Sequence, residues 1–302
     1  MTTPTSGSRA DVRLIDAHTH TQPSAAATRA FVGGLGMPVE RDGTPDDVVA
    51  SMDGAGIAWS LIVSVVFAQD AVDAAVTAGA DREAATADVL AAWHEQNSWA
   101  AGAAAARPDR LKAVVGVDPV LMTDAEVERE VRTQLAAGAS GIKVAPMFLR
   151  RRPDDERMDV VWRLAVELDV PVLSESGAVA PGEAFGHPRH FAEVVRSHPA
   201  LRLQIAHLGW GAEDDTAAIV RLSENVVTDT AMRLGGMGEP LDGEAVAATI
   251  RRIGVDRVVF GTNYPMIDQA AHARALRDLP LTDDELRRVG YANAARFWDR
   301  AG

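Results

Sequence analysis

The stretch Val12-Arg13-Leu14-Ile15-Asp16-Ala17-His18-Thr19-His20 lies near the start of the chain, where an apolar run leads into two histidines. The apolar run predicts a short buried strand. Side chains alternate along an extended segment, so residues two apart point to the same side. His18 and His20 can therefore offer two imidazole nitrogens to a single metal ion. The alternative interpretation is a pair of surface histidines in a turn.

Short β-branched runs recur along the whole chain and alternate with longer amphipathic or Ala-rich stretches, a pattern typical of βα units and a parallel sheet. We predict eight strands, within residues 12–17, 57–66, 111–117, 141–145, 170–174, 201–206, 225–228 and 255–260. Helices are predicted over 45–55, 81–107, 124–137, 155–168, 188–197, 212–222 and 242–253, with a C-terminal pair that begins at Gln269 and Thr282.

Eight strands, each followed by a helix, in a chain of 302 residues have the size and rhythm of a (β/α)8, or TIM, barrel. An open doubly wound sheet would usually carry a Gly-rich phosphate loop after its first strand, where this chain has histidines. We therefore expect a single TIM-barrel domain over residues 1–302, with a flexible tail at residues 1–10. The longest expected connection, residues 21–44, is either a lid over the barrel mouth or simply a long loop.

Composition limits the partners and the ligands. The chain has no cysteine, so a metal ion must be held by nitrogen and oxygen donors. A formal net charge of -13 argues against a general nucleic-acid or anionic-membrane surface. The polar N-terminus resembles no secretory signal, and no apolar stretch approaches the roughly 18 residues of a membrane span. We expect a cytoplasmic protein with a small-molecule substrate, and assembly into a homo-oligomer stays open.

Polar residues able to bind metal or move protons follow several predicted strands, which is where a barrel places its functional residues. Besides the two histidines of the first strand, these residues are Lys143, Glu175, His207, Asp229 and Asn263. Because they come from different strands at the same end of one sheet, we expect their side chains to meet in one site.

With these motifs in this order, the chain resembles the amidohydrolase superfamily, and within it the amidohydrolase-related branch of small-acid hydrolases, lactonases and nonoxidative decarboxylases. The resemblance spans nearly the whole chain. It rests on Asp16-Ala17-His18-Thr19-His20, Gly141-Ile142-Lys143, Pro171-Val172-Leu173 with Gly177, Gly186-His187-Pro188-Arg189, Ala206-His207-Leu208-Gly209 and Phe260-Gly261-Thr262-Asn263-Tyr264-Pro265.

The resemblance implies one divalent metal ion bound by the two first-strand histidines, a fifth-strand histidine and an eighth-strand aspartate. It also implies that His207 polarises or protonates the substrate. This chain departs from the pattern twice: Glu175 takes the place of the fifth-strand histidine, and Asn263 that of the aspartate. His18, His20 and Glu175 remain as a metal-ligand set that suits zinc, our first choice, and also matches nonhaem iron and manganese sites.

The change at Asn263 affects the mechanism, because an amide cannot accept a proton from an attacking water as a carboxylate can. The remaining candidates for a base are Glu175, His207 and Asp229, although Asp229 is equally interpretable as a helix cap. Asn263 can instead orient a water or donate a hydrogen bond to a substrate oxygen. His207 has a core interpretation as well, which its Ala-His-Leu-Gly context disfavours.

Two further residues are candidates for binding substrate. Lys143 can bind a substrate carboxylate, pair with Glu175 or be a carbamylated ligand, and we favour the first two because carbamylation belongs to a different branch of the superfamily. Trp210 follows the His207 motif and either forms a wall of the pocket or belongs to the core.

These features lead to three functional hypotheses. The first is a metal-dependent hydrolase of a small carboxylate-bearing or cyclic substrate, assisted by His207. The second is a metal-dependent lyase, such as a decarboxylase, in which the metal holds the acid and His207 handles the proton. The third is a metal-free or noncatalytic barrel that retains the fold as a scaffold.

Overall fold

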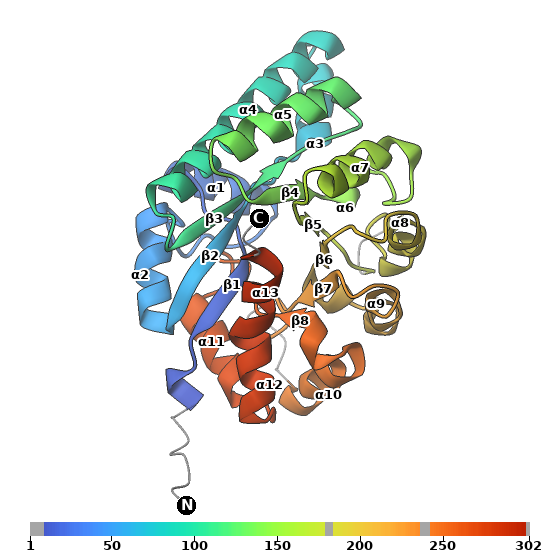
Figure 1. The fold of residues 1–302 in the computed structure, drawn as a ribbon. Coiled ribbons are helices and arrows are strands. Elements are labelled where there is room, and N and C mark those ends of the chain that lie inside the picture. The colour runs from blue at the N-terminus through green and yellow to red at the C-terminus, as the bar shows by residue number, and fades with distance from the viewer. Residues whose placement is uncertain (1–8, 179–183, 236–241, 300–302) are drawn as a thin grey trace, which may run out of the picture.

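In a computed structural model, which describes residues 9–178, 184–235 and 242–299, eight strands form one parallel sheet curved around an apolar interior (Figure 1). Each strand pairs with the next in chain order. The predicted TIM barrel is confirmed. The strands are β1 (Leu14–Thr19), β2 (Ile57–Val63), β3 (Leu111–Gly116), β4 (Gly141–Val144), β5 (Val172–Ser174), β6 (Leu203–Ile205), β7 (Val226–Asp229) and β8 (Val258–Val259).

The ring is closed by the segment that follows β8. The Ala17 amide donates to the Phe260 carbonyl at 2.9 Å, and the Asn263 amide donates to the His18 carbonyl at 2.9 Å. Thr19 and Tyr264 form a parallel bridge. Strand β8 begins later than predicted because residues Val255–Arg257 form a 3-10 turn. Closure of the ring therefore places Asn263 directly beside the first-strand histidines.

Helices lie between the strands and cover the outside of the sheet (Figure 1). Thr44 and Thr282 cap α2 and α12 with capping boxes, as their hydroxyl and acidic first turns predict. The helices are α1 (Ala25–Gly34), α2 (Pro45–Ala55), α3 (Ala68–Thr77), α4 (Arg82–Ala106), α5 (Asp124–Ala136), α6 (Pro146–Leu149), α7 (Asp159–Glu167), α8 (Phe191–Ser197), α9 (Glu213–Val220), α10 (Gly243–Ile253), α11 (Gln269–Asp278), α12 (Asp283–Arg287) and α13 (Asn293–Trp298).

The structure departs from the predictions at three helices and at the N-terminus. Helix α1 lies within the connection expected over 21–44, where Ser24 caps it, while α3 and α6 were not predicted. Residues 1–8 of the expected tail lie outside the described residues. Arg9 is anchored rather than flexible, because its guanidinium donates to the carbonyls of Arg277, Leu279 and Leu281.

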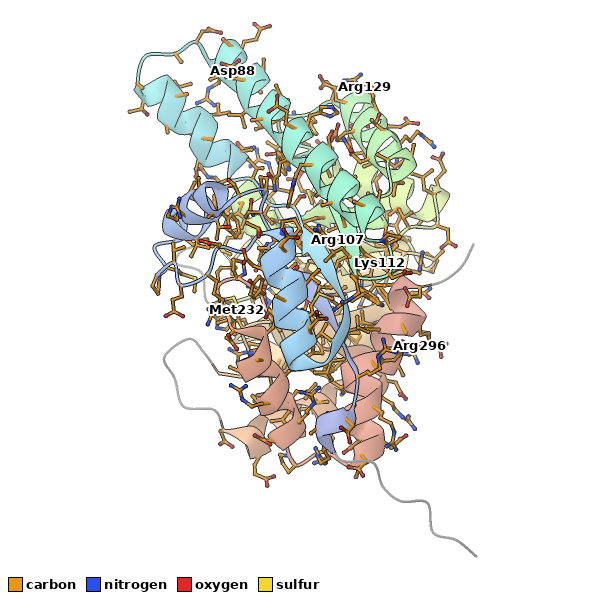
Figure 2. The ribbon with its side chains drawn as sticks, turned by 90° about the vertical axis from the view of Figure 1, so that its left-hand side faces the viewer. Asp88, Arg107, Lys112, Arg129, Met232 and Arg296 are labelled. Atoms are coloured by element: carbon orange, nitrogen blue, oxygen red, sulfur yellow. The ribbon has the colours of Figure 1, made fainter. Side chains whose placement is uncertain are left out.

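Helix α4, with 25 residues, is the longest in the described part of the chain; Asp88 lies near its projecting amino-terminal end, and Arg107 caps its carboxyl end beside the first strands (Figure 2). Among the described residues, no helix combines the length and the apolar character needed to cross a membrane.

The interior of the barrel is filled by alternate side chains of the strands, including Ile15, Leu61 and Leu173. Phe297 and Trp298 of α13 belong to the same buried cluster. Trp298 lies against the first residue of β4, because a Cβ added at Gly141 would be 3.0 Å from its ring. Helix α13 therefore seals the amino-terminal end of the barrel, opposite the end where the polar residues gather.

A glycine substitution tests this packing. We expect Gly141→Ala to lower the free energy of unfolding by about 2 kcal/mol, because the new Cβ would lie 2.5 Å from the Pro171 carbonyl oxygen. Gly102→Ala is the control: it lies inside α4 with no atom within 4 Å of the new Cβ, so we expect a gain of about 0.5–1 kcal/mol. Urea unfolding measures both, and equal effects would contradict the close packing around Gly141.

Candidate active site

The carboxyl ends of the strands bring the predicted site residues together. The rings of His18 and His20, at the end of β1, have centroids 5.1 Å apart, and His207 stacks on His18 at 5.0 Å. Glu175, directly after β5, has Oε1 3.1 Å from His207 Nε2. Asn263 is buried beside His18, as the closure of the barrel requires. The surface interpretation of the two histidines is therefore wrong.

Both first-strand histidines present one free nitrogen to the site. His18 Nδ1 lies 3.1 Å from Asp229 Oδ2, and His20 Nδ1 lies 3.1 Å from the Val63 carbonyl oxygen. Since both partners are acceptors, each ring carries its proton on Nδ1 and leaves a lone pair on Nε2. Burial lowers the pKa of both imidazoles, which keeps them neutral. His18 Nε2 is buried and has no hydrogen-bond partner among the described residues.

Asp229, the last residue of β7, is fully engaged by hydrogen-bond donors. Its Oδ1 accepts from the backbone amides of His207 and Ala231, both at 3.0 Å, and its Oδ2 accepts from His18 and from Gln204 Nε2 at 2.7 Å. Burial opposes the charged form, but His18 and His207 outweigh it and hold the pKa of Asp229 below its ordinary value. The residue lies in the site and caps none of the described helices; Asp242 caps α10, the next of these helices along the chain.

Glu175 lies between two cationic side chains. Its Oε2 is 3.7 Å from Lys143 Nζ, which is buried and has no hydrogen-bond partner among the described residues. Burial opposes ionisation, but His207 and Lys143 outweigh it and hold the pKa of Glu175 well below its ordinary value. Burial lowers the pKa of Lys143, against the attraction of Glu175 and Asp229. Lys143 and Glu175 thus form the pair anticipated from the sequence.

His207 faces an acceptor at each ring nitrogen. Nε2 lies 3.1 Å from Glu175 Oε1, and Nδ1 lies 3.0 Å from the Ala231 carbonyl oxygen. Burial opposes the charged form, but Glu175 and Asp229 outweigh it and raise the pKa of His207. A ring that donates at both nitrogens is an imidazolium. His207 is therefore arranged as a proton donor.

A left-handed turn carries His207. The φ angles of residues 207–211 are all positive, at 66° for His207, 52° for Leu208, 81° for Gly209, 25° for Trp210 and 84° for Gly211. Such a run is costly for residues with a Cβ and persists only where the surroundings hold it. A Cβ on Gly209 would overlap the Thr216 hydroxyl. Gly209 thus allows the turn that brings His207 back over the barrel mouth.

Aromatic rings extend the site outward from His20. Phe31 lies 5.2 Å from the His20 ring centroid and stacks on Phe67 at 5.7 Å, and Phe67 meets Phe148 edge-on at 4.7 Å. All three phenylalanines are half-buried. Trp210 is also half-buried, with its ring 6.0 Å from that of His207. Trp210 thus lies beside the site, as a wall residue would.

The donor set fits a divalent metal ion. Metal-binding histidines usually donate their second ring nitrogen to a carboxylate or a carbonyl, as His18 and His20 do here. Among the described residues, the group whose donor atoms lie within 4.8 Å of one another is His18, His207 and Asp229, and not the expected set of His18, His20 and Glu175. Both oxygens of Asp229 and both nitrogens of His207 already have partners within the protein. The buried Asn263 Oδ1, which has no hydrogen-bond partner among the described residues, is a further oxygen donor.

Sequence analysis missed Gln204 and the three phenylalanines. Gln204 is a polar residue inside the apolar run Leu203-Gln204-Ile205, which is a signal for a buried polar contact. Phe31, Phe67 and Phe148 carry no comparable signal, because single aromatic residues are common in loops and cores alike.

Comparison with protein-family models assigns the chain to a family. The chain belongs to the amidohydrolase family, whose model matches residues 15–300. A ribosomal RNA small subunit methyltransferase H from Thermobifida fusca (strain YX) is 31% identical over 143 residues, which are 44% of this chain and 39% of that protein. The chain thus spans about two fifths of the length of that relative.

Solved structures share the architecture over almost the whole chain. An uncharacterised TIM-barrel protein from Bordetella bronchiseptica has a TM-score of 0.71 at 19% identity, covering 94% of this chain and 98% of that one. A dihydroxybenzoic acid decarboxylase from Polaromonas sp. JS666 has a TM-score of 0.71 at 18% identity, covering 96% of this chain and 98% of that one. A 5-carboxyvanillate decarboxylase from Sphingomonas paucimobilis has a TM-score of 0.66 at 16% identity, covering 95% and 99%. At these identities the likeness shows the fold alone.

The ion pairs of Glu175 lead to a stability prediction. We expect Glu175→Gln to lower the free energy of unfolding of the metal-free protein by about 3 kcal/mol at pH 7, because Lys143 and His207 lose their buried counter-charge. The pKa of Glu175 is lowered in the fold, so its contribution is complete above the ordinary value of 4.5 and is lost as the pH falls below it.

The free energies of unfolding of the unmodified chain and of Glu175→Gln, measured in urea, should therefore differ less at pH 4 than at pH 7. Glu167→Gln is the matched control, since it breaks only the exposed ion pair with Arg132 and should have a much smaller effect. A Glu175→Gln variant as stable as the unmodified chain at pH 7 would contradict the charge arrangement.

Proposed function

We propose that this protein is a metal-dependent decarboxylase of a small aromatic carboxylic acid. The observation that carries the proposal is that His207 faces an acceptor at each ring nitrogen and so holds a proton at Nε2 inside the site. Nonoxidative decarboxylation of an aromatic acid needs a proton donor for the carbon that loses its carboxylate. Hydrolysis needs a free base for water, and Asp229 is engaged by four donors while Asn263 is an amide.

We assign the metal to Nε2 of His18 and of His20 together with the carboxylate of Glu175. When bound, the divalent ion supplies the positive charge that holds the oxygens of the acid in the site. Manganese replaces zinc as the first metal to test, because the Polaromonas decarboxylase was solved with bound manganese and the inhibitor 2-nitroresorcinol. The oxygen donors of Glu175 and Asn263 also suit manganese.

The charges of the site favour an anionic substrate. Without metal, the anions Glu175 and Asp229 balance the cations Lys143 and His207, so a divalent ion adds two uncompensated positive charges. A hydroxylated aromatic acid restores the balance through its carboxylate and phenolic oxygens. Lys143 Nζ, which lacks a hydrogen-bond partner among the described residues, is placed to bind one of these oxygens.

The rings around the site favour a planar substrate. Phe31 next to His20 and Trp210 next to His207 offer aromatic faces on two sides of the polar centre. In the reaction, His207 Nε2–H transfers its proton to the ring carbon that bears the carboxylate. The bond between this ring carbon and the carboxylate carbon then breaks. Its electron pair returns to the ring as carbon dioxide leaves. Solvent restores the proton on His207.

The assay that tests the proposal separates decarboxylation from hydrolysis. We expect protein loaded with Mn²⁺ to release carbon dioxide from hydroxybenzoates and to leave lactones and amides intact. Removing the metal with a chelator should abolish the release, and adding Mn²⁺ back should restore it. His18→Ala should bind no stoichiometric Mn²⁺. Metal-dependent cleavage of a lactone or amide without carbon dioxide release would replace the proposal with a hydrolase, and activity without metal would overturn the assigned ion.

Restoring the family's residues provides a second test. We expect Glu175→His combined with Asn263→Asp to retain metal binding but to slow carbon dioxide release about 10²-fold, because His207 loses the carboxylate that keeps its Nε2 protonated. Glu224→His combined with Asn225→Asp makes the same chemical changes away from the site and should leave the rate unchanged. A faster double variant at positions 175 and 263 would show that these residues are not adapted to the reaction.

A further inference from the structure

Gln204 occupies a position in the barrel interior where its neighbours are apolar. In the register of the sheet it lies between Leu173 of β5 and Val227 of β7, both of which belong to the buried interior cluster. The Gln204 side chain is fully buried. A buried amide costs free energy unless its hydrogen bonds are made, so the presence of Gln204 in this layer calls for specific partners.

Its partners allow only one orientation of the amide. Trp298 Nε1, a donor, lies 2.9 Å from Gln204 Oε1. Gln204 Nε2 lies 2.7 Å from Asp229 Oδ2 and 3.2 Å from the Ala17 carbonyl oxygen, both acceptors. Exchanging the amide oxygen and nitrogen would place the Gln204 N–H against the Trp298 N–H and the Gln204 oxygen against the Asp229 carboxylate. The indole N–H and the two acceptors together fix the orientation in which Gln204 donates to Asp229.

The Asp229 carboxylate connects the Gln204 amide to the His18 ring. Its Oδ2 accepts from Gln204 and from His18 Nδ1, and its Oδ1 is held by two backbone amides. A carboxylate held in this way needs a proton on His18 Nδ1. His18 Nε2 is then free of a proton and faces the site without a hydrogen-bond partner among the described residues.

We propose that Trp298 is a positioning residue that acts through Gln204 and Asp229 to hold His18 in the tautomer whose Nε2 binds the metal. Trp298 belongs to α13, which lies beside β1 and β8 and seals the far end of the barrel (Figure 1). The effect on metal affinity rests on the proposed metal site, whereas the effect on the His18 tautomer does not. The C-terminal helix thus contributes to the site across the barrel interior.

The test uses Trp298→Phe, which keeps an aromatic ring but removes the N–H. Without that donor the buried Gln204 Oε1 loses its partner, so the amide and the Asp229 carboxylate that it holds against His18 are less firmly positioned. We expect the Kd for Mn²⁺ to rise about 10-fold, in the range of other changes behind a metal ligand. In the metal-free protein, nitrogen NMR of the His18 ring should show the Nδ1-protonated tautomer, and Trp298→Phe should add the Nε2-protonated one. The His18 signals are assigned by their loss in His18→Ala.

Trp162→Phe is the matched control. Trp162 is also a buried tryptophan whose Nε1 donates a hydrogen bond, at 3.0 Å to the Pro153 carbonyl, but it lies on α7 outside the barrel interior. We expect this control to lose stability while its Mn²⁺ affinity and its His18 tautomer stay unchanged. Gln204→Met, which keeps the shape but removes all three side-chain hydrogen bonds of Gln204, should reproduce the effects of Trp298→Phe if that variant fails to fold.

The outcomes separate the two proposals. If Trp298→Phe and Gln204→Met keep the wild-type tautomer and an Mn²⁺ Kd within twofold of wild type, the positioning role is overturned. If the wild-type protein binds no Mn²⁺ but its His18 tautomer shifts in both variants, the positioning role stands and the assigned metal is overturned. If Trp162→Phe weakens Mn²⁺ binding as much as Trp298→Phe, general destabilisation explains the result and the positioning role is overturned.

Discussion

The buried carboxylate of Asp229 is the interaction on which the rest of the site depends. It accepts hydrogen bonds from the His18 ring, the Gln204 amide and the backbone amides of His207 and Ala231. These donors come from β1, from β6 and its end, and from the residues after β7. One charge thus orients the His18 imidazole and secures the start of the left-handed turn that carries His207. Because every acceptor position is used, the same carboxylate is unsuited to remove a proton from water.

Glu175 and Asn263, the two departures from the family's metal-ligand pattern, also determine how charge is distributed around this carboxylate. Glu175 brings a negative charge between Lys143 and His207, which keeps the His207 ring protonated. Asn263 removes a negative charge from the neighbouring strand end and leaves an uncharged oxygen facing the site. Compared with the family's pattern, the total charge of these two positions is conserved, but the negative charge lies closer to His207. This shift supports the proposed decarboxylation over hydrolysis.

Several parts of the fold could be predicted because their signals are local. Helix α2 has the predicted bounds, since a capping box starts it and Gly56, with a φ of 70°, ends it. The strands were located by their apolar runs, although most are shorter than predicted because the ends of each run lie outside the paired region. Helix α1 was not predicted, because Gly33 and Gly34 at its end favour a loop; in the structure Ser24 caps its start and Thr28 and Val32 are buried.

The sequence by itself determined that polar residues follow the strands and which of them can bind metal, because strand ends and residue chemistry are local properties. Only the tertiary structure decided the partners: that His207 faces Glu175, that Asp229 is engaged rather than free, and that Trp298 reaches Gln204. The physical reason is the closure of the barrel. The stagger between strands sets which interior side chains meet, and this stagger depends on the whole ring of hydrogen bonds rather than on any one segment.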